Sequence, residues 1–241
     1  MIAPAAFAVP INYGDHVGVN VTYLQVTEET LSAGDPDGLF GAPSVFGDQM
    51  DFNPVGVAAT ASGASGLDIT DAELTFGIEA KPNRTIESIT LTENGDCTLL
   101  GVGTVTTLAA VSASVIIEVF ELRGSAIMSI QTTTALTFAP SGGTHDLATE
   151  GQTILGTWSG SLVFDVAAFL DSEGILDGEA TLVQVTLDNQ LVATSEDGTT
   201  SFIAKKDADG LSVTATPEPG TGLMLVVGLL GLARAGRSRA R

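Results

Sequence analysis

Apolar and polar residues alternate along much of this chain, and no other feature constrains its fold as strongly. The run ELTFGIEA at residues 73–80 places every second side chain on an apolar face. This period of two is typical of a β-strand with one buried face. Similar runs recur roughly every 10 to 20 residues, with Gly, Asp and Asn between them and no long amphipathic helix. The pattern predicts an all-β protein, an antiparallel β-sandwich of jelly-roll-like form.

Several local signals predict where the strands turn or change. Asn94-Gly95-Asp96 predicts a hairpin turn, and Asp188-Asn189 is expected to end the strand at 183–187. The apolar phase shifts between Ile86 and Ile89, which indicates a β-bulge. The run VIIEVFEL at 115–122 suits a strand buried on both faces or a helix, and its β-branched residues favour the strand. Further expectations are a loop at 28–50, a strand near 52–58, a polar loop with a solvated His145 at 140–151, and a helical turn at 166–171.

The body of the chain, residues 9–215, is long enough for one substantial core. Cys97 is the only cysteine, so no internal disulfide can form. A lone cysteine in a strand pattern is expected to be a small apolar filler.

The body is strongly acidic. Five Lys and Arg and 28 Asp and Glu precede Pro217. Such a surface repels phosphate backbones and anionic lipids, which argues against nucleic-acid binding and peripheral membrane binding. Divalent cations and neutral glycans remain compatible partners.

The last 26 residues combine three features in order. Pro217-Glu218-Pro219 comes first, and an uncharged apolar run follows at 221–233. Proline fixes φ and lacks an N–H donor, so residues 216–220 are expected to stay out of helix and sheet. The apolar run, read as a short C-terminal hydrophobic helix, spans roughly 20 Å against a bilayer core of ~30 Å. We therefore expect weak or temporary anchoring, with the C-terminus held in the cytoplasm by Arg234, Arg237, Arg239 and Arg241.

This order of motif, apolar run and terminal arginines resembles the PEP-CTERM sorting signal. The resemblance implies an exported protein of a Gram-negative bacterium whose tail is read by an exosortase-type membrane processing enzyme, often alongside exopolysaccharide. It implies that Pro217, Glu218 and Pro219 are the recognition motif and that Arg234 begins the cytoplasmic stop. The block at 51–103 also resembles the body of a PEP-CTERM subgroup, which implies a fold and no chemistry. The alternatives are a buried C-terminal helix or an ordinary tail anchor.

The start of the chain suggests part of an export signal. Ala6-Phe7-Ala8 has the small-x-small pattern of a signal-peptidase site, with cleavage before Val9. No basic residue precedes it, and the first is Lys81. We interpret residues 1–8 as the remnant of a secretory signal peptide; the alternative is an authentic, unstructured N-terminus.

Two loops carry paired carboxylates that could bind calcium weakly. Asp35-Pro-Asp37-Gly38 and Asp207-Ala-Asp209-Gly210 each place two carboxylates before a glycine, which suits Ca²⁺ together with backbone carbonyls. Neither completes an EF-hand loop, and Asp-x-Asp-Gly is also ordinary turn chemistry. No cofactor is therefore expected, with calcium as the alternative.

No catalytic motif stands out. The chain lacks His-Glu-x-x-His, Gly-x-Ser-x-Gly and Gly-x-x-x-x-Gly-Lys patterns. It has one Trp and two Tyr, few for stacking sugars. We expect a structural or adhesive surface or matrix protein without catalysis, and the alternative is an extracellular glycan- or calcium-binding module. An exposed Trp158 would favour the module, and a buried one the structural protein. An enzyme would need His16 or His145 beside a serine or carboxylate in a cleft.

Overall fold

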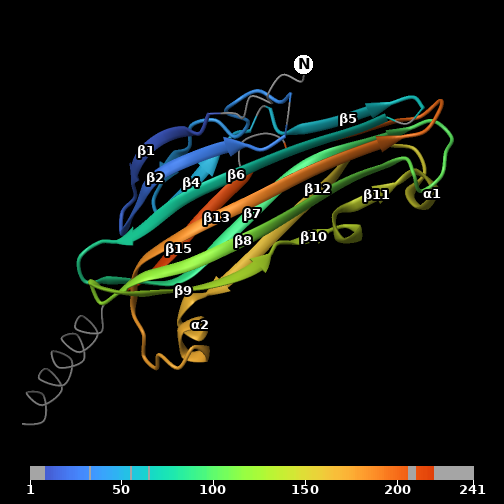
Figure 1. The fold of residues 1–241 in the computed structure, drawn as a ribbon. Helices are drawn as coiled ribbons and strands as arrows, with labels where there is room; N and C mark the ends of the chain where they lie inside the picture. Colours follow the sequence, from blue (N-terminus) through green and yellow to red (C-terminus); the bar gives the residue numbers. More distant parts are fainter. Residues whose placement is uncertain (1–8, 33, 55, 65, 206–209, 220–241) are drawn as a thin grey trace, which may run out of the picture.

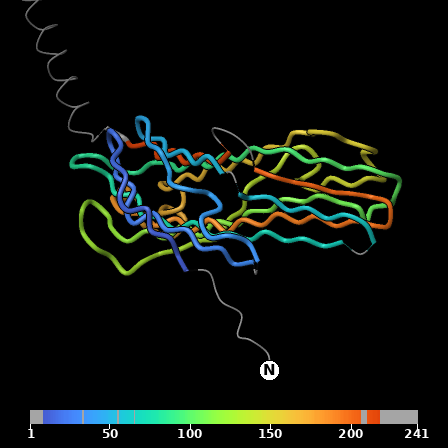
Figure 2. Tube along the Cα trace, turned by 90° about the horizontal axis from the view of Figure 1, so that it is seen from above, coloured from blue at the N-terminus to red at the C-terminus, as the bar shows by residue number. Residues whose placement is uncertain are grey.

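The computed structural model describes residues 9–219, except residues 33, 55, 65 and 206–209. In this part of the chain two antiparallel β-sheets pack face to face as an elongated sandwich (Figure 1). Most strands run along the long axis of the molecule, as the view from above shows (Figure 2). The predicted antiparallel β-sandwich is therefore confirmed.

One sheet contains seven of the described strands. Their order is β1-β2-β6-β13-β8-β11, and β9 also pairs with β8. The long strands β6, β13 and β8 lie at its centre. The bounds are β1 Ile11–Val17, β2 Val21–Thr30, β6 Gly66–Ala80, β8 Leu108–Leu122, β9 Ser125–Ala135, β11 Thr144–Asp146 and β13 Ala180–Ser195.

The other sheet contains eight described strands and is built around β7. Its order is β10-β12-β7-β15-β4-β3, and β14 pairs with both β7 and β5. Strand β7 thus pairs with β12 along one edge and with β14 and β15 along the other. The bounds are β3 Ser44–Phe46, β4 Gln49–Phe52, β5 Ala58–Ser62, β7 Arg84–Leu100, β10 Thr137–Ala139, β12 Thr153–Asp165, β14 Thr200–Lys205 and β15 Leu211–Pro219.

Successive strands alternate between the two sheets: β6, β7 and β8 do so, and so do β12, β13 and β14. Strand β13 returns between β6 and β8, while β12 returns beside β7. This order agrees with a jelly roll, although the jelly-roll form stays a prediction.

The described helices are short. They are the 3₁₀ turn Ser141–Gly143, α1 Leu147–Glu150 and α2 Val166–Ser172. Helix α2 confirms the helical turn expected there, and its N-terminus is capped by Asp165, which accepts a hydrogen bond from the Ala168 N–H at 2.8 Å. Across the described residues, no helix has the length and apolar composition to cross a membrane. The hydrophobic helix expected at 221–233 lies outside them.

Alternate side chains of both sheets form the core. Along β8, Val115, Ile117 and Val119 are buried whereas Ile116 is 39% exposed, so this run is a strand buried on one face only. The predicted bulge is also confirmed, because the pairing of β15 with β7 shifts between the partners of Ile86 and Ser88.

Two predicted turns are wrong. Asn94-Gly95-Asp96 lies inside β7, and Asp188-Asn189 lies inside β13. Gly95 serves close packing rather than a turn: a Cβ there would lie 2.1 Å from the Ala204 carbonyl oxygen and 2.3 Å from Trp158 Cζ2. Asn189 is buried by the facing sheet. Tertiary packing therefore overrides the local turn preference of these residues.

Two predictions near the N-terminus need smaller corrections. The segment 28–50 contains the end of β2, all of β3 and the start of β4. The strand expected near 52–58 is split between β4 and β5, because Pro54 lies in the gap and has no N–H for a ladder.

The expectation that residues 216–220 avoid the sheet is wrong for residues 216–219. Strand β15 continues through Pro219, and its last residues pair with β7 from Arg84 to Ser88. Two features make room for proline in this strand. The register shifts between Thr216 and Pro217, and β4 pairs only as far as Thr214, so the prolines lie beyond β4 at an open edge.

Candidate functional site

The Asp35–Asp37 loop does not form a metal site in the described part of the chain. Asp35 accepts a hydrogen bond from the Ser32 hydroxyl, and Asp37 is exposed. No group of three His, Cys, Asp or Glu side chains suited to a metal occurs among the described residues. Asp207 and Asp209 lie outside them, as do Arg234, Arg237, Arg239 and Arg241.

The polar aromatic residues lie mostly inside the sandwich. Trp158 is 2% exposed, and its indole N–H donates to the Asp96 carbonyl at 3.3 Å. Tyr23 is fully buried, and its hydroxyl donates to the Asp48 carbonyl at 2.6 Å. Tyr13 is half-buried and donates to Glu28 at 2.8 Å. None of the chain's Trp and Tyr side chains therefore forms an exposed stacking surface.

The prediction that His145 is solvated is wrong. The side chain is 2% exposed on β11, and its Nδ1 lies 3.1 Å from both carboxylate oxygens of Glu150. Helix α1 supplies Glu150 within the same short segment. The Ser141 hydroxyl also donates to Glu150, at 3.1 Å. The carboxylate thus lies between serine and histidine, whereas a nucleophilic triad needs the histidine in the middle.

Cys97 lies fully buried on β7, as expected of an apolar filler. Burial raises the pKa of its thiol to about 11, helped by the negative charges of Glu150 and Asp96. A raised pKa disfavours the thiolate, which is the reactive form. Cys97 is therefore a packing residue.

An ion pair and an amide meet in the centre of the sandwich, and the sequence analysis did not identify them. Lys205 Nζ at the end of β14 lies 2.6 Å from Glu93 Oε1 on β7. Asn189 on β13 donates from Nδ2 to the same oxygen at 2.5 Å. We call these three residues the core cluster. It joins both sheets, since β13 belongs to one and β7 and β14 to the other.

The core cluster is sealed from water. The side chains of Lys205 and Glu93 are 0% exposed, and Asn189 is 1% exposed. The Phe40 ring lies against the lysine, with its centroid 5.2 Å from Nζ. Burial lowers the pKa of Lys205, although the Glu93 charge opposes this effect. Among the described residues, Glu93 Oε2 and Asn189 Oδ1 find no hydrogen-bond partner.

A weak sequence signal did mark this cluster. Glu93 begins the ENGD run and Asn189 follows Asp188, the two places where turns were wrongly predicted. In both, polar residues interrupt an otherwise regular strand pattern. A polar residue that falls on the buried phase of a strand indicates a paired core group as readily as a turn.

A carboxylate pair lies on the outer face of β6 and β13. Asp188 and Asp71 share a hydrogen bond between their side chains, and Glu73 lies opposite Asp188 in the ladder. Partial burial, followed by the charges of Asp71 and Glu73, raises the pKa of Asp188. This pair is a site of local repulsion on an acidic surface.

Comparison with known proteins gives no family for this chain. No protein-family model matches it, and no curated protein does either. Among solved structures, it is similar to TmCBM61 in complex with β-1,4-galactotriose, at 8% identity and a TM-score of 0.22 over 63% of this chain and 70% of that one. It is also similar to the Trichoderma harzianum endoglucanase 3 of family GH12, at 10% identity and a TM-score of 0.21 over 90% of this chain and 100% of that one. A third, the non-crystalline cellulose-specific module CBM28, has 16% identity and a TM-score of 0.22 over 73% of this chain and 95% of that one. At these TM-scores the likenesses carry no argument about ligand or activity.

Proposed function

We propose that the chain is an exported structural or adhesive protein of the cell surface or extracellular matrix, without catalysis. One observation carries this proposal: Trp158 and Tyr23 are buried, so neither contributes to the exposed aromatic surface that a glycan site would use. Trp158 instead packs edge-to-face on Phe138 with ring centroids 5.9 Å apart. These large side chains stabilise the core rather than present a ligand surface.

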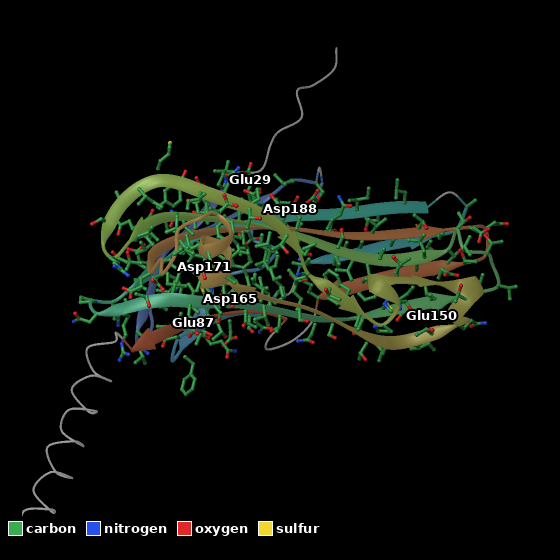
Figure 3. All side chains as sticks on the ribbon, turned by 90° about the horizontal axis from the view of Figure 1, so that it is seen from below. Glu29, Glu87, Glu150, Asp165, Asp171 and Asp188 are labelled. Atoms are coloured by element: carbon green, nitrogen blue, oxygen red, sulfur yellow. The ribbon has the colours of Figure 1, made fainter. Side chains whose placement is uncertain are left out.

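The acidic surface supports an extracellular setting. The labelled carboxylates do not all lie at one place: in Figure 3, Glu150 lies apart from Glu87, toward the opposite end of the molecule. Such a surface keeps a protein soluble and repels anionic polymers. We propose that the tail directs export through an exosortase-type enzyme, with Pro217-Glu218-Pro219 as its motif and the apolar run as a transient membrane anchor.

Affinity electrophoresis through neutral polysaccharides tests the structural role against the glycan-binding alternative. We expect the mobility of the body to stay unchanged in gels that contain cellulose-, xyloglucan- or galactan-type polymers. The matched variant is Phe46→Ala, because Phe46 is a strongly exposed aromatic side chain, at 87%. If a polysaccharide retards the parent protein and Phe46→Ala abolishes this retardation, the proposal is overturned and a glycan-binding surface is established.

The intact mass of the protein recovered from the producing cells tests the sorting route. A mass that corresponds to a chain ending near Pro219 would support proteolytic processing. A mass that retains Arg241 would mean that the tail is a lasting anchor, and the processing proposal would fail.

A further inference from the structure

We propose that the core cluster forms an intramolecular isopeptide bond between Lys205 Nζ and the Asn189 side-chain carbonyl carbon, with Glu93 transferring the proton. The three groups that this reaction requires, an amine, a carboxamide and a carboxyl group, meet at one point in the sandwich. The inference goes beyond the proposed surface role and does not depend on it.

The first step of the argument is proximity. Lys205 Nζ and Asn189 Nδ2 contact the same atom, Glu93 Oε1, at 2.6 and 2.5 Å. The amine and the amide are therefore neighbours, held by strands of opposite sheets. A fixed encounter of this kind replaces a bimolecular reaction by an intramolecular one, with effective concentrations far above those in solution.

The second step is activation of the amine. A lysine attacks a carbonyl only when it is neutral, and desolvation in an apolar pocket is a common way to reach that form. Lys205 is fully buried, and burial lowers its pKa. Transfer of its proton to Glu93 converts a buried ion pair into a neutral amine and a neutral acid, which an apolar interior tolerates better.

The third step is the bond exchange, which balances without another reactant. Nζ bonds to Asn189 Cγ, and the Cγ–Nδ2 bond breaks. Glu93, which holds the first proton from Nζ, gives it to Nδ2 and takes the second proton that Nζ loses, since its Oε1 contacts both nitrogens. Nδ2 leaves as neutral ammonia, and Glu93, which exchanges protons with both nitrogens as general acid and general base, ends as a neutral acid.

The surroundings favour this reaction over hydrolysis. The three side chains are at most 2% exposed, and Phe40 covers the amine. Water therefore competes poorly for Asn189. The product would join β13 to β14 across the two sheets and would remove a buried charge pair whose desolvation is costly.

Intact-mass spectrometry of the full chain tests the proposal directly. We expect the folded protein to be lighter than its sequence mass by about 17 Da, the mass of ammonia lost on acylation of a lysine. Peptide mapping should give a branched peptide joining residues 189 and 205, with no tryptic cleavage after Lys205. Lys205→Arg and Glu93→Gln should both keep the full mass.

Asn189→Asp provides a variant that reacts. Its carboxyl would lose water rather than ammonia, so its final mass should equal that of the cross-linked parent. Lys81→Arg is the matched lysine control and should still show the loss, because Lys81 bonds to the Gly18 carbonyl elsewhere. A succinimide at Asn189 would also lose ammonia, but it would persist in Lys205→Arg and give no branched peptide. A folded parent at full sequence mass, or a loss that persists in Lys205→Arg, would overturn the proposal.

Discussion

At the residue scale, the core cluster is the least expected feature of this protein. A buried ion pair is weak support for stability, because desolvating both charges offsets much of their attraction. Hydrophobic residues of similar size would fill the space between β7, β13 and β14 at lower cost. The cluster also leaves Glu93 Oε2 and Asn189 Oδ1 without described partners. A chemical role for the three side chains accounts for this arrangement better than packing does.

The carboxylate pair on the outer face should respond to pH. Asp188 has a raised pKa in the folded state, so the folded chain binds its proton more tightly than the unfolded chain. The burial of Asp188, together with its repulsion by Asp71 and Glu73, therefore destabilises the fold as pH rises above the usual carboxyl range, and this cost disappears in acid. Asp188→Asn should raise the free energy of unfolding by up to about 1 kcal/mol at neutral pH, and less at low pH.

Urea unfolding from pH 3 to 8 measures this effect. Asp37→Asn is the matched control, because Asp37 is an exposed loop carboxylate and its removal makes the net charge less negative by the same amount. An equal gain from both variants would mean that overall charge, rather than the Asp71–Asp188 contact, causes the effect.

Gly95 should be intolerant of a side chain. A Cβ would lie 2.1 Å from a backbone oxygen and 2.3 Å from the Trp158 ring, and neither can move without disturbing β12 or β14. Gly95→Ala should cost roughly 3 kcal/mol or more, at the upper end for an overpacked core. For Gly77→Ala, also in a strand, the nearest atoms are side-chain carbons of Leu24 and Leu182 at 3.3 to 3.9 Å, so it should cost much less. Thermal unfolding of the two variants compares them, and equal losses would contradict the packing role of Gly95.

At the element scale, the sequence predicts strands well where apolar alternation is regular and fails where tertiary contacts decide. The run at 73–80 and the β-branched run at 115–122 are strands because their pattern needs only one buried face. Glu93 and Asn189 look like turn residues because their partners lie on other strands, far along the chain. For the same reason the core cluster could not be assembled from spacing: it is formed by β7, β13 and β14 together.

Strand β15 should be essential to the body although it leads into the tail. Leu211, Val213 and Ala215 are almost fully buried, and β15 lies between β7 and β4. A chain ending at Pro219 keeps every described strand and should unfold as the full body does. A chain ending at Gly210 loses two large buried side chains and two ladders, roughly 5 kcal/mol or more by burial alone. Circular dichroism melting of both truncations measures the difference.

The outcome for the two truncations also bears on processing. Residues 217–219 pair with Arg84 to Ile86 on β7. An enzyme that needs them extended and free can therefore act only when this end of β15 has separated from β7. Equal stability of the two truncations would show that β15 contributes little, and the motif would then be readily accessible.

At the scale of the whole molecule, the dominant feature is the net negative charge. The chain carries a formal charge of −20, and its carboxylates lie along both layers of the sandwich (Figure 3). Salt screens such repulsion, with a Debye length of ~30 Å at 0.01 M and ~8 Å at 0.15 M. The melting temperature should therefore rise by several degrees between these concentrations of NaCl, since about 1 kcal/mol corresponds to ~2–4 °C for a domain of this size.

A comparison with calcium distinguishes general charge screening from binding at a specific site. At matched ionic strength, CaCl₂ and MgCl₂ should raise the melting temperature to a similar extent if they act only as counterions, and this is the result that the proposed cofactor-free structural role predicts. A specific site would instead give a further gain with calcium that saturates with concentration, because a ligand that binds only the folded state stabilises it by mass action. Asp35→Asn and Asp207→Asn, one from each Asp-x-Asp-Gly loop, would then assign the site. Loss of the calcium-specific gain in either variant would contradict the cofactor-free structural role and support the calcium-binding alternative.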